Sequence, residues 1–165
     1  MRGKEGCFLK KETKKLITCI AVPLATGAVS GFFTRNGMKV FARLDKPPLS
    51  PPGWLFPVVW SILYVMMGIA SYLIYQMDAK DEDVKKSMKL YLIQLGVNFF
   101  WPILFFRFEW YLAAFLWLVL LWILIFRTMH QYKKLSKTAC YLMLPYLLWV
   151  TFAGYLNLGI YFLNK

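Results

Sequence analysis

Tryptophan is the residue type in this sequence with the most distinctive chemistry. An indole ring stacks on flat molecules, can be oxidised, and carries one N–H donor that needs a partner when it is buried. The seven tryptophans stand in or beside long uncharged runs. Trp60, Trp101 and Trp149 lie seven to eleven residues inside such runs, too deep for the interfacial belt that suits Trp54 and Trp110. We therefore expect these three indoles to face the protein interior.

Helical spacing places the deep tryptophans on faces that carry further rings and amides. Such a face is either well-packed core or the lining of a pocket, and the spacing alone leaves both interpretations open. A pocket of this composition suits a large, flat, mostly apolar molecule such as a tetrapyrrole or a sterol. Three runs carry these stripes: Phe56, Trp60 and Tyr64; Gln94, Asn98, Trp101 and Phe105; and Trp149, Phe152, Ala153 and Leu156.

The uncharged runs exclude several kinds of chemistry. They contain no His, Asp, Glu or Lys, which argues against an ion or proton pathway and against a conventional nucleophile–base pair. Cys7, Cys19 and Cys140 are too scattered for a disulfide framework or a metal cluster. His130 stands alone in a basic loop, where we expect it to be solvated. We expect no metal site and no obligatory cofactor.

The elements that position these side chains are membrane spans. The chain has 165 residues, of which 59% are hydrophobic and 17% charged. A bilayer core needs about 20 apolar residues of helix, and a hairpin must separate the third and fourth runs because one helix through both would be about 55 Å long. We predict an all-α membrane protein: a basic tail, 1–15, and one five-transmembrane-helix domain, 16–165. The uncharged runs are 16–33, 53–76, 90–106, 110–126 and 138–164.

The positive charge predicts the topology. The net charge is +12, and 14 of the 20 Lys and Arg residues fall in the tail and in loops 76–89 and 127–137. By the positive-inside rule the amino terminus is cytoplasmic. The same charge suits contact with anionic membrane lipid, so we expect no nucleic-acid partner. Compact basic ends favour a bacterial cytoplasmic membrane over a mitochondrial one.

The first loop, 34–52, is rich in proline. Proline forbids helix and stiffens the entry into the second span. The loop is either a rigid connector or a lid over the pocket, and as a lid its cations would meet acidic ligand groups such as propionates. The candidate lid residues are Arg43, Lys46, Pro47, Pro51 and Pro52.

Two glycines on one face of the first span form a Gly-x-x-x-Gly pattern. Gly27 and Gly31 permit close contact between helices. The contact is either packing within the bundle or an interface of a homodimer, and the pattern leaves both open.

The same residues resemble a known family, the translocator protein family, also called tryptophan-rich sensory protein or peripheral-type benzodiazepine receptor. The ordered set covers four of the five spans and is specific as a set. The matching pieces are Lys46-Pro47, Pro51-Pro52-Gly53-Trp54, Pro57-Val58-Val59-Trp60, Leu63-Tyr64, Gly68, Gln94-Leu95, Asn98, Trp101-Pro102, Phe105-Phe106, Pro145-Tyr146, Trp149, Phe152-Ala153 and Leu156-Asn157.

The resemblance implies a five-helix bundle, commonly dimeric, whose pocket is covered by the first loop. It implies binding of porphyrins such as protoporphyrin IX and of synthetic isoquinoline or benzodiazepine ligands, with sterol in animal members. By motif, Asn98, Trp101, Ala153 and Leu156 would line the pocket. The sequence departs from the family at Leu49 and at Val40-Phe41, where tryptophan and a Trp-Tyr pair are usual, and at Trp117, where an acidic residue is common.

Three functions compete. The protein is a receptor or sensor that holds a tetrapyrrole, a catalyst of porphyrin breakdown, or a passive carrier of porphyrin, lipid or sterol. For the catalyst, the resemblance implies that Trp60 and Trp149 take part in light- and oxygen-dependent porphyrin degradation, as in bacterial relatives. Sensing and carriage are not separated by the sequence.

Overall fold

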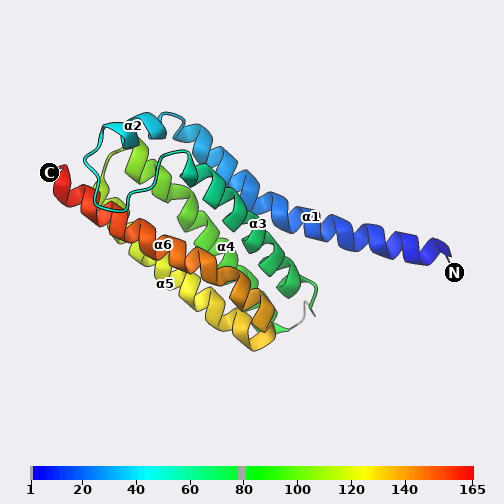
Figure 1. The fold of residues 1–165 in the computed structure, drawn as a ribbon. Helices are drawn as coiled ribbons and strands as arrows, with labels where there is room; N and C mark the ends of the chain where they lie inside the picture. Colours follow the sequence, from blue (N-terminus) through cyan, green and yellow to red (C-terminus); the bar gives the residue numbers. More distant parts are fainter. Residues whose placement is uncertain (1, 78–80) are drawn as a thin grey trace.

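The protein is a bundle of long helices (Figure 1). The computed structural model describes residues 2–77 and 81–165, with side chains from residue 12 onward. Within these residues the chain forms helices and short connections without strands. The helices are α1 (Arg2–Phe33), α2 (Gly37–Arg43), α3 (Leu55–Tyr75), α4 (Glu82–Pro102), η1 (Ile103–Arg107), α5 (Tyr111–Leu135) and α6 (Lys137–Leu163).

Five stretches of the described chain are long and apolar enough to cross a membrane. They are Glu12–Phe33, Leu55–Tyr75, Glu82–Arg107, Tyr111–Leu135 and Lys137–Leu163. This confirms the predicted fold class, an all-α membrane protein with five spans. The turn between Arg107 and Tyr111 is the hairpin that the length argument required.

Several helices are longer than the uncharged runs that predict them. α1 begins at Arg2, inside the predicted tail 1–15, and its first turns extend beyond the other helices (Figure 1). α4 begins eight residues before Leu90, and α5 continues nine residues past Phe126. Hydropathy marks only the part of a helix that suits the bilayer, whereas Lys, Glu and Met continue a helix into water at little cost.

Side-chain caps fix where two of these helices start. The Asp81 carboxylate accepts a hydrogen bond from the Asp83 N–H at 2.7 Å. The Ser136 hydroxyl accepts one from the Ala139 N–H at 3.2 Å. Each cap satisfies a backbone donor that the first turn of a helix leaves unpaired. The α5–α6 hairpin is therefore tight, with Ser136 as its single connecting residue.

Two glycines let α1 approach α3 closely. A Cβ on Gly27 of α1 would lie 2.2 Å from the Tyr64 ring of α3. A Cβ on Gly68 of α3 would lie 2.6 Å from the Ile20 Cα of α1. Both distances are far below van der Waals contact, so each helix presents a glycine where the other comes nearest. The remaining principal contacts join α3 to α6, α4 to α5, and α5 to α6.

The third span ends in a widened turn that the sequence pattern does not predict. Pro102 has no N–H to continue the α-helical bonding, and the chain opens into the π-helical η1. There the Phe108 N–H donates to the Ile103 carbonyl at 3.1 Å, the five-residue spacing of a π-helix. The extra residue places Phe105 in the core and leaves Phe106 half-buried beside it.

The first loop is partly helical. α2 occupies Gly37–Arg43, so proline excludes helix only in the second half of the predicted loop 34–52. α2 and the extended segment after it lie at the same end of the bundle as the carboxyl end of α6 (Figure 1). This end is opposite the one from which α1 projects.

Candidate functional site

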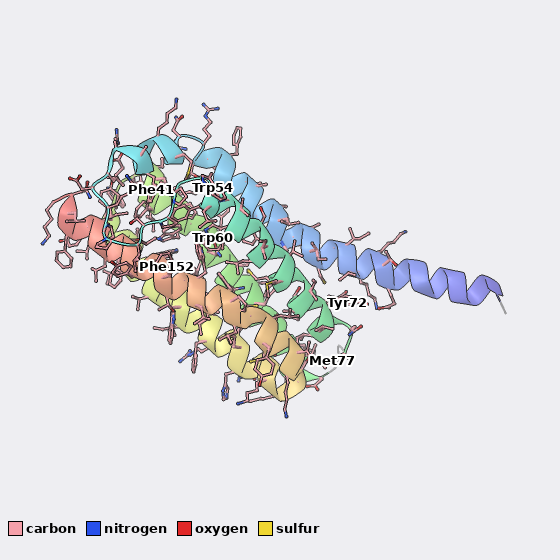
Figure 2. The ribbon with its side chains drawn as sticks, in the orientation of Figure 1. Phe41, Trp54, Trp60, Tyr72, Met77 and Phe152 are labelled. Atoms are coloured by element: carbon pink, nitrogen blue, oxygen red, sulfur yellow. The ribbon has the colours of Figure 1, made fainter. Side chains whose placement is uncertain are left out.

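A cavity of about 480 Å³ lies between α1, α3 and the end of α4, next to α2. Its lining carries no charged side chain. Figure 2 shows Trp60 on α3 and Phe41 on α2 at this end of the bundle, with Tyr72 and Met77 at the opposite end. The lining residues are Leu24, Gly27, Ala28, Ser30, Gly31, Thr34, Met38, Phe56, Pro57, Trp60, Ser61, Tyr64, Trp101, Pro102 and Phe106.

Four of the predicted pocket residues, Phe56, Trp60, Tyr64 and Trp101, meet on this cavity. Trp60 lies 5.5 Å from Tyr64 between ring centroids, with the planes 32° apart. Trp101 is buried, and its indole N–H donates to the Asn157 side-chain oxygen at 3.2 Å. This meets the expectation that a deep indole finds its partner inside the protein. Two helices thus contribute ring walls to one space.

A buried polar network stands behind Tyr64. The Tyr64 hydroxyl donates to the Asn98 oxygen at 3.3 Å, and the Asn98 amide donates to the Tyr146 hydroxyl at 2.6 Å. The Tyr146 hydroxyl donates in turn to the Gln94 oxygen at 3.0 Å. Because each of these groups is buried, leaving one unpaired would cost free energy. Asn98 thus contacts Tyr64 directly and Gln94 only through Tyr146, both behind the cavity wall, and the Gln94 amide nitrogen is buried without a partner among the described residues.

Phe105, Ala153 and Leu156 surround a neighbouring space that is almost filled, with a volume of about 10 Å³. It shares Phe56, Trp101 and Phe106 with the cavity. Phe41 of α2 helps to close it, with its ring centroid 5.1 Å from that of Phe56. The predicted pocket residues thus divide into an open cavity on the α1 side and a packed region on the α6 side.

Trp149 and Phe152 belong to the α6 side and do not line the cavity. The Trp149 ring is 5.9 Å from Phe56 and 5.7 Å from Phe152. Contrary to the expectation for a deep indole, its buried indole nitrogen has no hydrogen-bond partner among the described residues. Phe56 therefore lies between Trp149 and the cavity, whereas Trp60 is on the cavity wall.

The two cations of the candidate lid, Arg43 and Lys46, have partners within the protein. Arg43 pairs with Glu109 of the α4–α5 turn. The Lys46 ammonium donates to the Ala42 and Leu44 carbonyls at 3.3 and 3.1 Å and lies 5.3 Å from the Phe41 ring centroid. Neither residue lines the cavity, so the predicted contact with ligand acids is not present in this arrangement.

The extended part of the first loop is hydrogen-bonded to α6 and to Asn164 just after it. The Asp45 N–H donates to the Asn164 oxygen at 3.0 Å, and the Asn164 amide donates back to the Asp45 carbonyl at 2.8 Å. The Tyr155 hydroxyl donates to the Pro48 carbonyl at 3.0 Å. Pro47 is buried against Gly159, where a Cβ would lie 2.7 Å from the proline ring.

The structure also places Pro51 and Pro52 of the first loop. It further places Leu49 and Trp117, two residues that depart from the family pattern. Pro51 and Pro52 precede α3, and the Pro52 carbonyl accepts a hydrogen bond from the Leu55 N–H at 3.0 Å. Leu49 is 83% exposed and has a φ of 66°. Trp117 donates its indole N–H to the Val97 carbonyl at 2.7 Å, which ties α5 to α4.

α1 also lines the cavity, although none of its residues was predicted to do so. Leu24, Ser30 and Thr34 line it together with Gly27 and Gly31. The signal was present, because residues 27, 30, 31 and 34 share one helix face, but it was interpreted as a contact between helices. Gly27 makes such a contact with Tyr64, whereas a Cβ on Gly31 would meet nothing within 4 Å.

In the described part of the chain, no three His, Cys, Asp or Glu side chains come together in a group that could hold a metal ion. Cys19 and Cys140 are free thiols, and His130 is exposed. Cys7 lies outside the residues whose side chains are described. The cavity lining itself offers aromatic ring faces and the hydroxyls of Ser30, Thr34, Ser61 and Tyr64.

Comparison with known proteins identifies the family. The model of the TspO/MBR family matches residues 19–163. The chain is 40% identical to the tryptophan-rich protein TspO of Chlorobaculum tepidum, over 94% of this chain and 99% of that protein. It is 34% identical to the translocator protein of Bos taurus, over 82% of each chain. It is 31% identical to the tryptophan-rich sensory protein of Cereibacter sphaeroides, over 71% and 72% of the two chains. The resemblance found in the sequence is thus confirmed, and the chain belongs to the TspO/MBR family of membrane proteins.

Proposed function

We propose that this protein is a receptor-like membrane protein that binds a flat hydrophobic tetrapyrrole, with protoporphyrin IX as the test ligand. The observation that carries the proposal is the uncharged cavity of about 480 Å³ with Phe56, Trp60, Tyr64, Trp101 and Phe106 among its walls. Small-molecule pockets have volumes of about 300–1,000 Å³ and are mostly apolar and aromatic. Ring walls on α3 and α4 favour a ligand with two broad faces.

The ligand enters from the side of the bundle, between α1 and α3. Ala28, Gly31, Pro57 and Ser61 line the cavity and are exposed at the molecular surface. The lid, in contrast, is fastened to α6 and to the α4–α5 turn. A lipid-soluble ligand reaches such an opening through the bilayer without any movement of the lid.

Acidic groups of the ligand would lie near α2. Thr34 and Met38 line that end of the cavity, and each is followed directly by an exposed cation, Arg35 or Lys39. Arg43 and Lys46 are held in other contacts. We therefore assign the recognition of ligand carboxylates to Arg35 and Lys39, in place of the two lid cations named from the sequence.

A titration with protoporphyrin IX tests the proposal. Trp60→Leu removes a stacking face from the cavity wall, whereas Trp122→Leu removes an indole that is 36% exposed on α5 and lines no part of this cavity. Aromatic stacking contributes about 0.5–1.5 kcal/mol beyond area burial, so Trp60→Leu should weaken binding by at least about threefold. Trp122→Leu should leave the affinity unchanged, and equal effects would place the ligand elsewhere.

A second candidate activity is the light- and oxygen-dependent breakdown of bound porphyrin. One observation favours it. Trp60 is an oxidisable indole on the cavity wall, and its ring centroid lies 5.5 Å from that of Tyr64 and 6.0 Å from that of Tyr146. Aromatic contacts thus lead from the cavity wall into the protein interior. Trp149 is separated from the cavity by Phe56. If the activity exists, Trp60 is the residue that touches the porphyrin, and Trp149 acts from behind Phe56.

Orientation and assembly are proposals as well. We place the protein in a cytoplasmic membrane with the amino terminus in the cytoplasm, on the distribution of Lys and Arg. A homodimer stays a proposal that rests on the family. Gly27 is used inside the bundle against Tyr64, so a dimer contact through α1 would use other residues of that helix.

A further inference from the structure

A second cavity, of about 550 Å³, lies between α4 and α5 at the end of the bundle opposite the lid. It shares no residue with the proposed tetrapyrrole site. Its lining combines a polar group of residues with an aromatic wall. The polar residues are Lys86, Arg127, His130 and Gln131, and the aromatic wall is formed by Trp122 and Phe126.

The two cations of this cavity are available to an anion. Lys86 and Arg127 are exposed, and neither forms an ion pair with a carboxylate of residues 12–77 or 81–165. The nearby acid Glu82 is engaged by Lys85 at 2.6 Å. His130 adds a ring N–H donor on the same side of α5 as Arg127. A phosphate group between α4 and α5 would therefore find two cations and a further donor.

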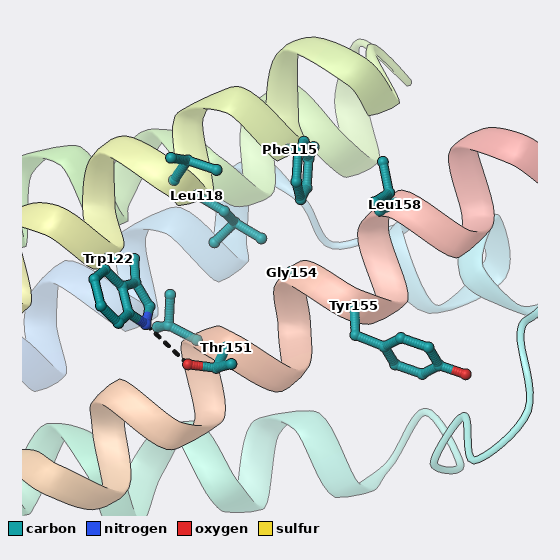
Figure 3. A pocket seen from close by; sticks show the side chains of 9 residues that line it. Phe115, Leu118, Trp122, Thr151, Gly154, Tyr155 and Leu158 are labelled. Atoms are coloured by element: carbon teal, nitrogen blue, oxygen red, sulfur yellow. Dashed lines mark hydrogen bonds between the residues drawn. The ribbon is translucent and has the colours of Figure 1, made fainter.

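The aromatic wall is rigid. The Trp122 and Phe126 rings are stacked with centroids 5.6 Å apart and planes only 3° from parallel. The Trp122 indole N–H donates to the Thr151 hydroxyl of α6 at 2.9 Å, as Figure 3 shows. Trp122 is thus fixed across the α5–α6 groove of Figure 3 and presents its ring to both spaces. A flexible hydrocarbon chain can pack along such a surface.

The cavity crosses the boundary between headgroups and hydrocarbon. Arg127 is the first charged residue after the uncharged run 110–126, and Lys86 stands four residues before the start of the run 90–106. Trp122 lies five residues before Arg127, about 7.5 Å deeper at 1.5 Å per residue. The polar end is therefore at headgroup level and the aromatic end in the acyl region. A soluble anion would use only the polar end.

The carboxamide of Gln131 offers a buried hydrogen-bond acceptor that a donor on the bound ligand would satisfy. Gln131 is 8% exposed and lines the cavity, and its side-chain oxygen is buried without a hydrogen-bond partner among the described residues. The last side-chain torsion of glutamine is soft, so this oxygen can turn toward a bound group. A headgroup hydroxyl would satisfy it, whereas the quaternary ammonium of a choline headgroup would not.

We propose that the α4–α5 cavity binds one anionic phospholipid whose headgroup carries hydroxyls, of the phosphatidylglycerol type. The phosphate lies between Lys86, Arg127 and His130, and a headgroup hydroxyl donates to the Gln131 oxygen. One acyl chain lies along the stacked rings of Trp122 and Phe126. The site is separate from the tetrapyrrole cavity, and its occupancy does not depend on the function proposed for that cavity.

Quenching of tryptophan fluorescence by brominated lipids tests this site in the full-length protein. The protein is reconstituted in phosphatidylcholine vesicles that contain dibrominated phosphatidylglycerol or, in a parallel series, dibrominated phosphatidylcholine. The Trp122→Phe variant identifies the part of the quenching that Trp122 reports. We expect phosphatidylglycerol to be preferred over phosphatidylcholine at Trp122 by about fivefold or more, because one cation near a membrane surface contributes about that factor.

Two charge-matched double variants locate the cations. Lys86→Gln with Arg127→Gln should reduce the preference to less than about twofold. Lys133→Gln with Lys134→Gln removes the same charge from the same end of α5, at residues that do not line the cavity, and should leave the preference intact. If the first double variant does not insert, Arg127→Gln and Lys133→Gln serve as the single pair.

Three outcomes would overturn the proposal. The first is an unmodified protein that shows no preference for phosphatidylglycerol. The second is an equal loss in both charge variants, which would mean that the charge acts as a diffuse surface. The third is displacement of the brominated lipid by millimolar glycerol phosphate, which would make this a site for soluble anions.

Discussion

At the scale of single residues, the cavity walls offer hydroxyls and aromatic rings, and charged groups are absent from them. The sequence indicated which residues are involved, since the stripes of Phe56, Trp60 and Tyr64 and of Asn98 and Trp101 do converge. It did not indicate which of these residues line the open cavity and which pack beside or behind it. Tyr146 was matched to the family but given no role, and yet it is fully buried and joins Asn98 to Gln94.

Trp60→Phe separates binding from breakdown of the porphyrin. A phenyl ring still stacks, so the affinity for protoporphyrin IX should change by no more than roughly tenfold. The light-driven loss of the Soret band, if Trp60 must be oxidised, should stop. The measurement is bleaching of the bound porphyrin at equal occupancy, with Trp122→Phe as the control. Bleaching of Trp60→Phe at the parent rate would make Trp60 a wall without a chemical role.

At the scale of helices, hydropathy located the spans but not the irregular parts. Uncharged runs fixed the five spans because each apolar helix must cover the bilayer. The π-helical η1 was not predictable from Pro102 alone, because proline also kinks or ends helices. α2 was missed because the prolines of the first loop dominated its interpretation. The contact between α1 and α3 follows from two glycines whose neighbours are more than thirty residues away in sequence.

Gly68→Ala and Gly96→Ala should shift the stability in opposite directions. The added Cβ at Gly68 would lie 2.6 Å from the α1 backbone, so overpacking should cost about 1–3 kcal/mol. At Gly96 nothing lies within 4 Å, and alanine in a helix gains about 0.5–1 kcal/mol over glycine. Thermal unfolding in detergent should show a lower midpoint for the first variant only. A Gly68→Ala midpoint at or above that of Gly96→Ala would contradict the close α1–α3 contact.

At the scale of the whole molecule, the two ends of the bundle differ both in charge and in shape. The lid end carries α2, the extended segment and the carboxyl end of α6, and the other end carries the amino-terminal part of α1 and the basic ends of α4 and α5 (Figure 1). The distribution of Lys and Arg alone predicted this division. The position of the open cavity was not predictable, because it depends on how far α1 lies from α3 beyond their glycine contact.

Labelling of single cysteines tests the orientation. Leu49 is 83% exposed in the lid segment, and Asp83 is exposed at the start of α4. In a background without the native cysteines, a membrane-impermeant thiol reagent added to intact cells should label Leu49→Cys and leave Asp83→Cys unlabelled. Both should react after the cells are permeabilised. Labelling of only Asp83→Cys in intact cells would reverse the proposed topology.

The most direct measurement of the central claim is porphyrin affinity after the α1–α3 cavity is filled. Gly31 lines that cavity, and a Cβ there meets nothing within 4 Å, so Gly31→Phe occupies the ligand space without a clash at its first carbon. Gly154→Phe makes the same change on α6, also with open space, in the groove of Figure 3. Titration with protoporphyrin IX should show at least a tenfold loss of affinity, about 1.4 kcal/mol, for Gly31→Phe and parent affinity for Gly154→Phe. Parent affinity in Gly31→Phe would show that the tetrapyrrole does not bind in this cavity.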